Sequence, residues 1–476
     1  MMLRRCALFL CLLAFSGPAF GDAPQFDPKP WLDDLTQMRT AFATKYANLE
    51  WAVFDRQADL NDYFARAQSH IEQAPDAGSA RAAFDGLIRR LGDGHVQVDW
   101  PTPKSLPSQS QTPDACGDYD ASYSVKPLAA LAPGYVALNT PQSDVFPAGV
   151  IVSAKHRVGV LQIGMFSPQG SPALCKEALA ALAIAEDKPC NESCSDRIDA
   201  WASARMTHLF MAQIEALKAA KVDTLMIDIA GNGGGSEWAE AAMRIVTPIR
   251  LQSERMDFVR GAQWIKEFGD LETKLRQAAQ TAMPSDKAFL LRLADQAKSK
   301  RADAGTHCDS EPLWRGEHPA CSLLGQGFYG SGLIASADPA MLSGKPWAAT
   351  VFSPMEFPYR EGVWRGPLMV LADNESWSAA EEFAAVLQDN HAAIIVGVPT
   401  GGAGCGHTDG SEPVVLAHSG GKLELPDCAR LRADGSNEVR GVRPDVLVGW
   451  RKFDGPRLRA ADLQAALPGA LEKFRK

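Results

Sequence analysis

The spacing of apolar residues predicts a helical beginning followed by a region of buried strands. In "SARAAFDGLIRRLGDGH", the apolar residues from Phe84 to Leu91 recur at the spacing of one helix face, and Gly92 ends the pattern. The next residues, "HVQVDW", alternate polar and apolar side chains as a half-buried strand does. We therefore expect a helical N-terminal subdomain over residues 22–100 that ends in a short strand.

Further along the chain, short apolar runs alternate with helical patterns. The runs "VGVLQIGMF", "TLMIDI", "GPLMVL" and "AAIIVGV" have the length and composition of strands buried on both faces. Helical spacing follows "GPLMVL" and also fills residues 194–220. This order predicts an α/β core with a largely parallel sheet over residues 158–450, interrupted by a mixed helical and loop insertion at about 252–360. We expect a linker or reduced module at 101–157 and a closing helix at 451–476.

The first residues have the composition of a secretory signal peptide. "MMLRRCALFLCLLAFSGPAFGDAP" starts with a basic pair, continues with a short apolar run and ends in small residues. No later stretch approaches the roughly 18 apolar residues of a membrane span. We therefore expect residues 1–21 to be removed and the protein to be exported, periplasmic or secreted, with no membrane span.

The cysteine content agrees with export. Two of the 10 cysteines lie in the predicted signal peptide, and an even number remains, as is typical of a chain held by disulfides in an oxidising compartment. The remaining cysteines allow 105 pairings, so their spacing does not fix the connectivity. We expect Cys405 and Cys428 to be bridged because they flank the hairpin-like "VVLAHSGGKLEL". Cys308 and Cys321 are close enough in sequence to staple a loop of the insertion.

Charge and motif content exclude several classes of partner and cofactor. The formal net charge is −9, and no basic cluster with interleaved aromatic residues occurs, which argues against nucleic acid as a partner. The chain has no G-x-G-x-x-G loop, no Walker lysine and no H-E-x-x-H pair, so we expect no cofactor and no metal. Nothing in the sequence indicates an oligomeric state.

Candidate chemistry is concentrated in two turns that follow predicted strands. "GNGGG" (231–235) follows "TLMIDI", and the serines Ser376 and Ser378 of "ADNESWSAAEEF" follow "GPLMVL". Active sites of parallel sheets gather at such strand ends. A serine before a helix is, by itself, more simply a helix cap. A nucleophile also needs a base and backbone N–H donors for the oxyanion, and a helix start and a glycine turn are both able to supply such donors.

Three motifs in this order resemble the tail-specific (carboxyl-terminal processing) serine protease family. They are "DIAGNGGG" (228–235), "SAAE" (378–381) and "GVPTGG" (397–402). The resemblance covers most of residues 84–100 and 158–450, without the insertion. It implies a ClpP/crotonase-like core of repeated strand–turn–helix units.

The resemblance also implies roles for the residues around the serine turn. It places the nucleophile on Ser378 and leaves Ser376 as a neighbouring or capping serine. It implies that the backbone N–H groups of Ala379 and of Gly234, or Gly233, face the oxyanion. The glycine turn and the helix start would then form the two halves of one oxyanion hole.

Branches of this family differ in the residue that acts as the general base. Many members use a lysine at the position of Ala403, and no lysine occurs between Lys345 and Lys422. The chain instead resembles the branch of the tricorn core protease and the interphotoreceptor retinoid-binding protein, in which a histidine from the N-terminal segment is the base. "LGDGH" then gives His95 as the base, and "NEVRGVRPD" gives Glu438 as a carboxylate that orients and supports the site.

Several of these positions have plainer alternatives or depart from the family pattern. His95 could end its helix by bonding nearby backbone, Glu438 could be a solvated turn residue, and His407 in "GCGH" is the second candidate for the base. Ala230 replaces the usual arginine of the glycine motif. Residues 101–157 are too short for the peptide-binding PDZ module of many members, so recognition of free carboxyl termini does not follow from the resemblance.

The function that agrees with these residues is that of an exported serine endopeptidase acting on peptides or unfolded proteins. The alternative is a catalytically silent peptide- or ligand-binding protein on the same scaffold, as the retinoid-binding relatives illustrate. A non-proteolytic acyl-transfer enzyme, by similarity to crotonases, is a third and more distant function. The presence of a serine, a base and oxyanion donors together favours the peptidase.

Overall fold

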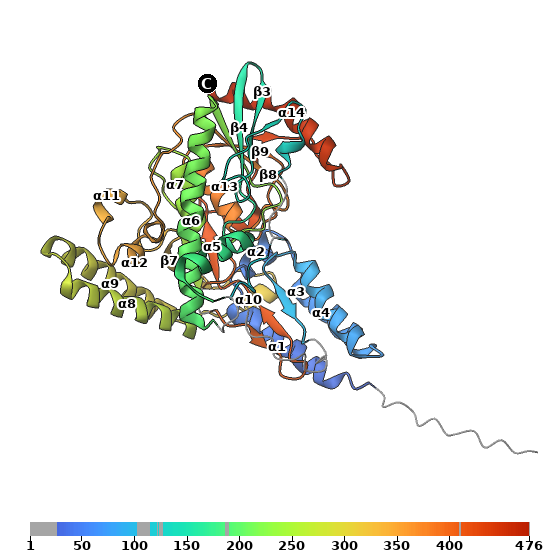
Figure 1. The fold of residues 1–476 in the computed structure, drawn as a ribbon. Coiled ribbons are helices and arrows are strands. Elements are labelled where there is room, and N and C mark those ends of the chain that lie inside the picture. The colour runs from blue at the N-terminus through green and yellow to red at the C-terminus, as the bar shows by residue number, and fades with distance from the viewer. Residues whose placement is uncertain are drawn as a thin grey trace, which may run out of the picture.

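A seven-stranded sheet lies at the centre of the computed structural model, with helices on both sides (Figure 1). The structure describes residues 26–101, 115–120, 122, 127–185, 190–408 and 411–475. The signal peptide predicted at 1–21 lies outside the described residues, as do residues 102–114, 121 and 123–126 of the linker predicted at 101–157.

The N-terminal region is helical, as the sequence predicted. Its helices are α1 (Lys29–Lys45), α2 (Leu49–Phe54), α3 (Leu60–Glu72) and α4 (Ala77–Leu91). Trp31 and Phe42 belong to their common apolar core. α4 ends at Gly92, whose φ of 71° is a conformation that glycine adopts without a steric penalty. The chain then enters β1 (Gln97–Asp99), so His95 lies in the connection between helix and strand.

The central sheet confirms the α/β class. Its strands, in spatial order, are β13 (Val446–Leu447), β9 (Ile394–Gly397), β8 (Leu368–Ala372), β5 (Thr224–Asp228), β4 (His156–Gln162), β3 (Ala148–Ser153) and β2 (Val136–Ala137). The five strands from β13 to β4 run parallel, and β3 and β2 add an antiparallel edge. All four apolar runs singled out in the sequence form parallel strands of this sheet.

Alternate residues of the strands face two different layers of helices. Leu225 and Ile227 pack against the layer formed by α5 (Pro172–Leu182), α6 (Glu192–Ala219), α7 (Trp238–Ile245) and α13 (Ala379–Asp389). Met226, between them, faces α14 (Pro456–Glu472) on the other side. Both strand faces are therefore buried, which is why β5 reads as a continuous apolar run. No helix in the described part of the chain is long and apolar enough to cross a membrane.

The strand β3 differs from the sequence analysis, which placed these residues in a linker. "AGVIVS" pairs along its whole length with β4, through a tight turn in which Ala154 and Lys155 both have positive φ. The hairpin adds an antiparallel edge to a parallel sheet. A six-residue strand joined by so short a turn gives little periodicity, so it was not distinguished from the Pro- and Ser-rich residues before it.

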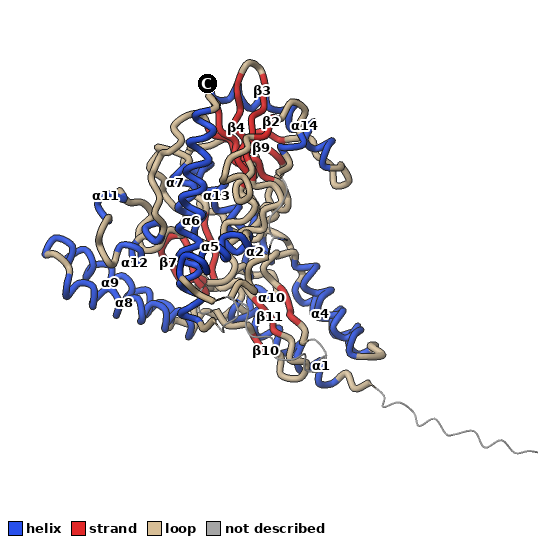
Figure 2. The backbone as a smooth tube through the Cα atoms, in the orientation of Figure 1, coloured by secondary structure: helices blue, strands red, loops and turns tan. Residues whose placement is uncertain are grey.

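The predicted insertion contains a helical hairpin and a second small sheet. α8 (Ala262–Thr281) and α9 (Pro284–Ala304) pack side by side and project away from the central sheet (Figure 2). β6 (Arg255–Val259) pairs with β7 (Leu324–Tyr329) and with β12 (Cys428–Leu431). The insertion is therefore joined by backbone hydrogen bonds to a strand near the end of the chain.

A third sheet connects the N-terminal region with the same late segment. β1 pairs antiparallel with β11 (Lys422–Glu424), which also pairs with β10 (Val414–Val415). β10 and β11 are the hairpin predicted from "VVLAHSGGKLEL". Residues 411–431 thus contact both the N-terminal helices and the insertion, and the segment that carries His95 is held by main-chain pairing.

The described residues contain four disulfides. Two of them, Cys405–Cys428 and Cys308–Cys321, confirm the sequence prediction. The others are Cys116–Cys175 and Cys190–Cys194. The Cys405–Cys428 bridge joins the loop after β9 to the first residue of β12.

Removing the Cys405–Cys428 bridge should destabilise the fold. The bridged residues are 23 apart, and closing a loop of this size in the unfolded chain stabilises a protein by about 3 kcal/mol. We expect the Cys405→Ser/Cys428→Ser double variant to lose about this much free energy of unfolding in urea titrations. The Cys190→Ser/Cys194→Ser variant is the control, because its residues are only 4 apart and the loss should be smaller. An equal or larger loss in the control would contradict the prediction.

Candidate active site

Ser378 lies in a strained turn between β8 and α13. The strand ends at Ala372, α13 begins at Ala379, and Ser378 has φ 54° and ψ −119°. A positive φ is uncommon for a residue with a side chain and costs about 1–3 kcal/mol, so it persists only where neighbouring contacts hold it. Here Trp377 donates its N–H to the carbonyl of Asn232 (2.9 Å). The residue Ser378 is thereby held, half-buried, just after the carboxyl end of a parallel strand.

Ser376 has a different role from Ser378. Its side chain is fully buried, donates to the carbonyl of Ile229 (2.8 Å) and accepts from the N–H of Asp373 (2.9 Å). These bonds tie the serine turn to the end of β5. The hydroxyl of Ser376 is therefore committed to structure.

The glycine turn lies directly against Ser378. A Cβ atom built on Gly234 would lie 2.7 Å from the Cβ of Ser378, and Gly234 has φ 110°, so only glycine fits there. The N–H of Gly234 donates to Asn232 Oδ1 (2.8 Å). By contrast, the N–H groups of Gly233 and Ala379 bond to no other group in the described part of the chain. The N–H of Gly234, which the sequence analysis expected to face the oxyanion, is thus already bonded, whereas the N–H groups of Gly233 and Ala379 are unbonded in the described chain.

Asp373 and Asp228 hold the glycine turn although Ala230 replaces the arginine of the family motif. Asp373 Oδ1 accepts from the N–H of Gly231 (2.8 Å), and Asp228 Oδ1 accepts from the N–H of Ala230 (3.1 Å). Burial raises the pKa of Asp228 to about 7, against the lowering effect of the backbone N–H groups of Ala129 and Ala230. Ala230 itself packs into the apolar core. The turn is therefore not loosened at this position.

His95 is oriented by bonds on two sides. Its backbone N–H donates to Asp93 Oδ1 (2.9 Å). The carboxylate of Asp93 also accepts from the hydroxyl of Tyr46 and the side-chain amide of Asn48. On the ring, Nδ1 lies 2.8 Å from the carbonyl oxygen of Ala403. Because a carbonyl only accepts, Nδ1 carries the hydrogen, and the neutral ring presents an unprotonated Nε2. His95 therefore has the tautomer that a general base requires.

The carboxylate of Glu381 joins the serine helix to the loop that holds His95. One oxygen accepts from the hydroxyl of Thr400 (2.6 Å) and the N–H of Gly402 (2.7 Å). The other accepts from the N–H groups of Ala403 (2.7 Å), Gly404 (3.2 Å) and Ser378 (3.1 Å). Glu381 is the last residue of "SAAE", so the motif contains the residue that fixes the partner loop.

Direct packing also brings the histidine and serine turns together. A Cβ built on Gly94 would lie 2.8 Å from the indole of Trp377 and 3.3 Å from the Cβ of Ala403. Gly94 precedes His95, and Trp377 precedes Ser378. The residues before the predicted base and nucleophile are therefore in contact, although they are far apart in the sequence.

The structure places the second candidate base beside the first. His407 Nε2 lies 3.2 Å from the carbonyl oxygen of His95 and 3.8 Å from Glu424 Oε2. The two histidine rings meet edge to face, with centroids 5.8 Å apart. His407 is more exposed than His95 and contacts the backbone of His95.

Glu438 is buried, and its partner is an arginine that the sequence analysis did not single out. Glu438 Oε2 accepts from Arg430 Nε, and Glu438 bonds no atom of His95 in the described part of the chain. Burial raises the pKa of Glu438, and the positive charge of Arg430 opposes that rise. The alternative that Glu438 is a solvated turn residue is therefore wrong. No motif marks Arg430, since an arginine near the end of a short strand is ordinary.

Comparison with known proteins identifies the family. The model of peptidase family S41 matches residues 197–448, which is more than half of the chain. The chain belongs to peptidase family S41. This S41 peptidase is therefore a serine-type hydrolase, and the resemblance to tail-specific proteases is confirmed. No curated protein sequence matches the chain.

Solved structures show the same fold at low sequence identity. Mature CPAF is 16% identical with a TM-score of 0.54, and the match covers 94% of this chain and 96% of that one. Mature CPAF complexed with lactacystin is 15% identical with a TM-score of 0.53, covering 94% and 98%. A peptidase-like protein from Parabacteroides merdae is 14% identical with a TM-score of 0.45, covering 94% and 97%. The CPAF likeness establishes the fold of the S41 peptidase over nearly its whole length.

A groove of about 580 Å³ adjoins the loop that holds His95. Its lining includes Cys405 and His407 from this loop, and Glu237, which follows the glycine turn. Other lining residues come from the insertion, among them the apolar residues Phe268 and Leu271 of α8. The insertion of the S41 peptidase therefore borders the loop that holds His95. No group of His, Cys, Asp or Glu side chains suited to a metal ion occurs among the described residues.

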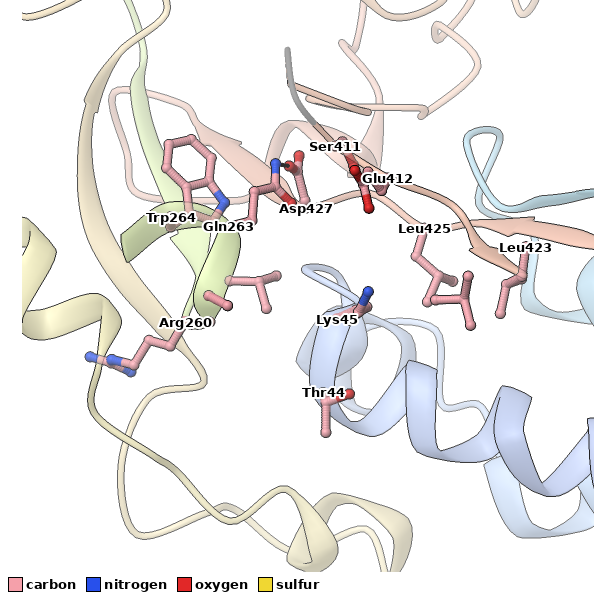
Figure 3. A pocket seen from close by; sticks show the side chains of 14 residues that line it. Thr44, Lys45, Arg260, Gln263, Trp264, Ser411, Glu412, Leu423, Leu425 and Asp427 are labelled. Carbon is pink, nitrogen blue, oxygen red and sulfur yellow. Dashed lines mark hydrogen bonds between the residues drawn. The ribbon is translucent and has the colours of Figure 1, made fainter. Parts of the chain in front are cut away.

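A separate, smaller cavity of about 130 Å³ lies between the end of α1 and the start of α8 (Figure 3). Asp427 and Gln263 face each other on its wall, where Gln263 Nε2 donates to Asp427 Oδ2 (2.6 Å). The same carboxylate accepts from the N–H and hydroxyl of Thr408. Ser378 and His95 are not among the residues that line this cavity. The lining residue Asp427 instead binds Thr408, the residue that follows His407.

The environment of His95 predicts an acid-shifted titration. Burial lowers the pKa of His95 below its ordinary 6.5. The Ala403 carbonyl and the Asp93 carboxylate oppose this lowering but do not cancel it, and the charges of His407 and Arg430 lower the pKa further. We expect NMR titration of the ring protons, with the resonance assigned by its loss in His95→Gln, to give a midpoint below 6.5. A midpoint at or above 6.5 would show that the ring is not desolvated as described.

Proposed function

We propose that this S41 peptidase is an exported serine endopeptidase in which Ser378 is the nucleophile and His95 is the base. The observation that carries the proposal is the ring orientation of His95, whose Nδ1–H is held by the Ala403 carbonyl in a loop that Glu381 fixes to Ser378. The N-terminal sequence and the four disulfides support export, because disulfides persist in oxidising compartments.

The proposed reaction follows from the groups at the serine turn. Ser378 Oγ attacks the carbonyl carbon of a peptide bond while His95 Nε2 takes its proton. The negative charge that develops on the carbonyl oxygen is met by the N–H groups of Gly233 and Ala379. His95 then returns the proton to the leaving amine, and water hydrolyses the acyl-enzyme by the same steps in reverse.

The proposed substrates are peptides or unfolded proteins, because the groove beside the loop is open and has polar and apolar walls. In the proposed organisation, residues 22–100 supply the base, 158–450 form the catalytic core, and 101–157 stand in place of a PDZ module. A catalytically silent binding protein is less well supported, since such a protein has no need of the strained serine and the oriented histidine together.

Substitution of the proposed nucleophile and base tests this assignment. Ser378→Ala and His95→Ala should each reduce peptide turnover by several orders of magnitude without loss of the fold, because the two residues act as a unit. Wild-type protein should also form an adduct at Ser378 with a fluorophosphonate probe, mapped by mass spectrometry. His407→Ala is the matched control and should retain most activity. Ala403→Lys should not raise activity, since Ala403 is fully buried and a histidine already serves as the base.

Two outcomes would overturn the assignment. A wild-type protein without turnover and without an adduct would favour the binding-protein function. An active His95→Ala variant beside an inactive His407→Ala variant would move the base to the loop after Thr400. If the assignment holds, turnover should fall with decreasing pH only below 6.5, because the lowered pKa keeps His95 neutral to lower pH.

The groove predicts that the insertion selects substrates by size. Leu271 lines the groove from α8, so Leu271→Trp should narrow it and reduce cleavage of long peptides several-fold more than cleavage of short ones. The rate of labelling by the small fluorophosphonate probe should be unchanged. Lys298→Trp, on the exposed surface of α9, is the control for adding a tryptophan to the hairpin. Unchanged relative rates for long and short peptides in a folded Leu271→Trp variant would reject the gating role.

A further inference from the structure

Arg430 makes hydrogen bonds to four separate groups from a buried position at the edge of the groove. Its Nε donates to Glu438, and its Nη1 donates to Glu382 Oε2 (3.1 Å). Its Nη2 donates to two backbone carbonyl oxygens, those of Ser378 (3.0 Å) and Gly404 (2.9 Å). All three guanidinium nitrogens are thus engaged, two with carboxylates and one with main chain.

The two backbone contacts belong to the two halves of the proposed catalytic apparatus. Ser378 is the proposed nucleophile, and its carbonyl lies at the start of α13. Gly404 follows Ala403, whose carbonyl holds the ring of His95. One Nη2 group bonded to both carbonyls therefore fixes the distance between the serine turn and the loop that orients the base.

We propose that Arg430 is a positioning residue for peptide cleavage, and that Glu438 acts on the site by holding Arg430 and not by contact with His95. This inference rests on the proposed roles of Ser378 and His95. Arg430 is one of the residues that line the groove, but none of its hydrogen bonds reaches the side chain of Ser378 or of His95. Its effect is exerted through the geometry of the serine and histidine.

The geometry of the guanidinium group explains why an arginine is required. Its planar fork presents donors in several fixed directions, whereas a lysine ammonium is a compact charge on a flexible stem. A buried cation is also costly unless it is paired and hydrogen-bonded. Glu438, Glu382 and Glu254 supply negative charge around Arg430, and their attraction raises its pKa despite burial. The arginine therefore remains charged while it holds the two carbonyls.

A purely structural role for this charge cluster is the simpler alternative, and a neighbouring arginine provides the control. Arg432 lies on the same side of the cluster, with Nη2 bonded to Asp389 Oδ1 (2.6 Å) and Nε 3.4 Å from Glu254. It bonds neither Ser378 nor Gly404 in the described chain. Loss of Arg432 therefore disturbs the charge cluster without releasing the two catalytic segments.

The test compares Arg430→Lys with Arg432→Lys in the full-length mature protein. Both variants keep the charge, so both should fold, as checked by circular dichroism and urea titration. We expect Arg430→Lys to reduce kcat and the rate of fluorophosphonate labelling at Ser378 by about tenfold or more, with little change in KM, because hydrogen bonds to a charged donor are lost. Arg432→Lys should leave the labelling rate within about twofold of wild type.

Glu438→Gln provides a second readout. If Glu438 acts through Arg430, Glu438→Gln should lower the rate of peptide cleavage at every pH without moving the pH midpoint that His95 sets. The Arg430→Lys/Glu438→Gln double variant should then cleave no more slowly than the slower of the two single variants. A shifted midpoint in Glu438→Gln would show direct action on His95 and overturn the inference.

The remaining outcomes are also decisive. If folded Arg430→Lys were labelled at the wild-type rate, the inference would be rejected while the proposed function stayed intact. The same conclusion would follow if Arg430→Lys and Arg432→Lys lost the same fraction of the labelling rate. Should Arg430→Lys not fold, the pH midpoint of Glu438→Gln decides the question by itself. If wild-type protein forms no adduct at Ser378, the proposed function and the inference fail together.

Discussion

The buried carboxylate of Glu381 is the interaction on which the candidate site depends. A carboxylate removed from water is destabilising unless hydrogen bonds replace its solvation, and here five donors do so. Three of the five are consecutive backbone amides, from Gly402 to Gly404, and another is the amide of Ser378. The serine helix and the loop after Thr400 are therefore unable to separate without leaving a buried charge unpaired. The position of His95 follows from this, because the loop carries the carbonyl that orients its ring.

The parts of the fold that local pattern determines were predictable from the sequence. The parallel strands are buried on both faces and read as continuous apolar runs, and α4 ends at a glycine in the left-handed conformation. The turn that carries Ser378 was recognisable because it contains a short motif, which also includes Glu381. The Cys405–Cys428 pair was found because it flanks a hairpin.

The parts that depend on contacts between distant segments were not predictable. The bond from Gly234 to Asn232, which removes one expected oxyanion donor, depends on the φ and ψ angles of a single turn. The partner of Glu438 is Arg430, which no motif marks and which packs against Ser378 only because β12 pairs with a strand of the insertion. Sequence reasoning assigned Glu438 a supporting role but not the residue through which a supporting effect would pass.

The Cys405–Cys428 disulfide has a consequence for where the enzyme can be assembled. It connects the loop that holds His95 to the strand that carries Arg430, two residues beyond Cys428. In a reduced chain this junction would rest on non-covalent contacts alone, so the loop and the strand would be free to part more often. Oxidation of this pair therefore stabilises the contact between these two segments as well as the fold. Under reducing conditions the peptidase would therefore carry this junction in a loosened form, and its full rigidity would depend on an oxidising environment.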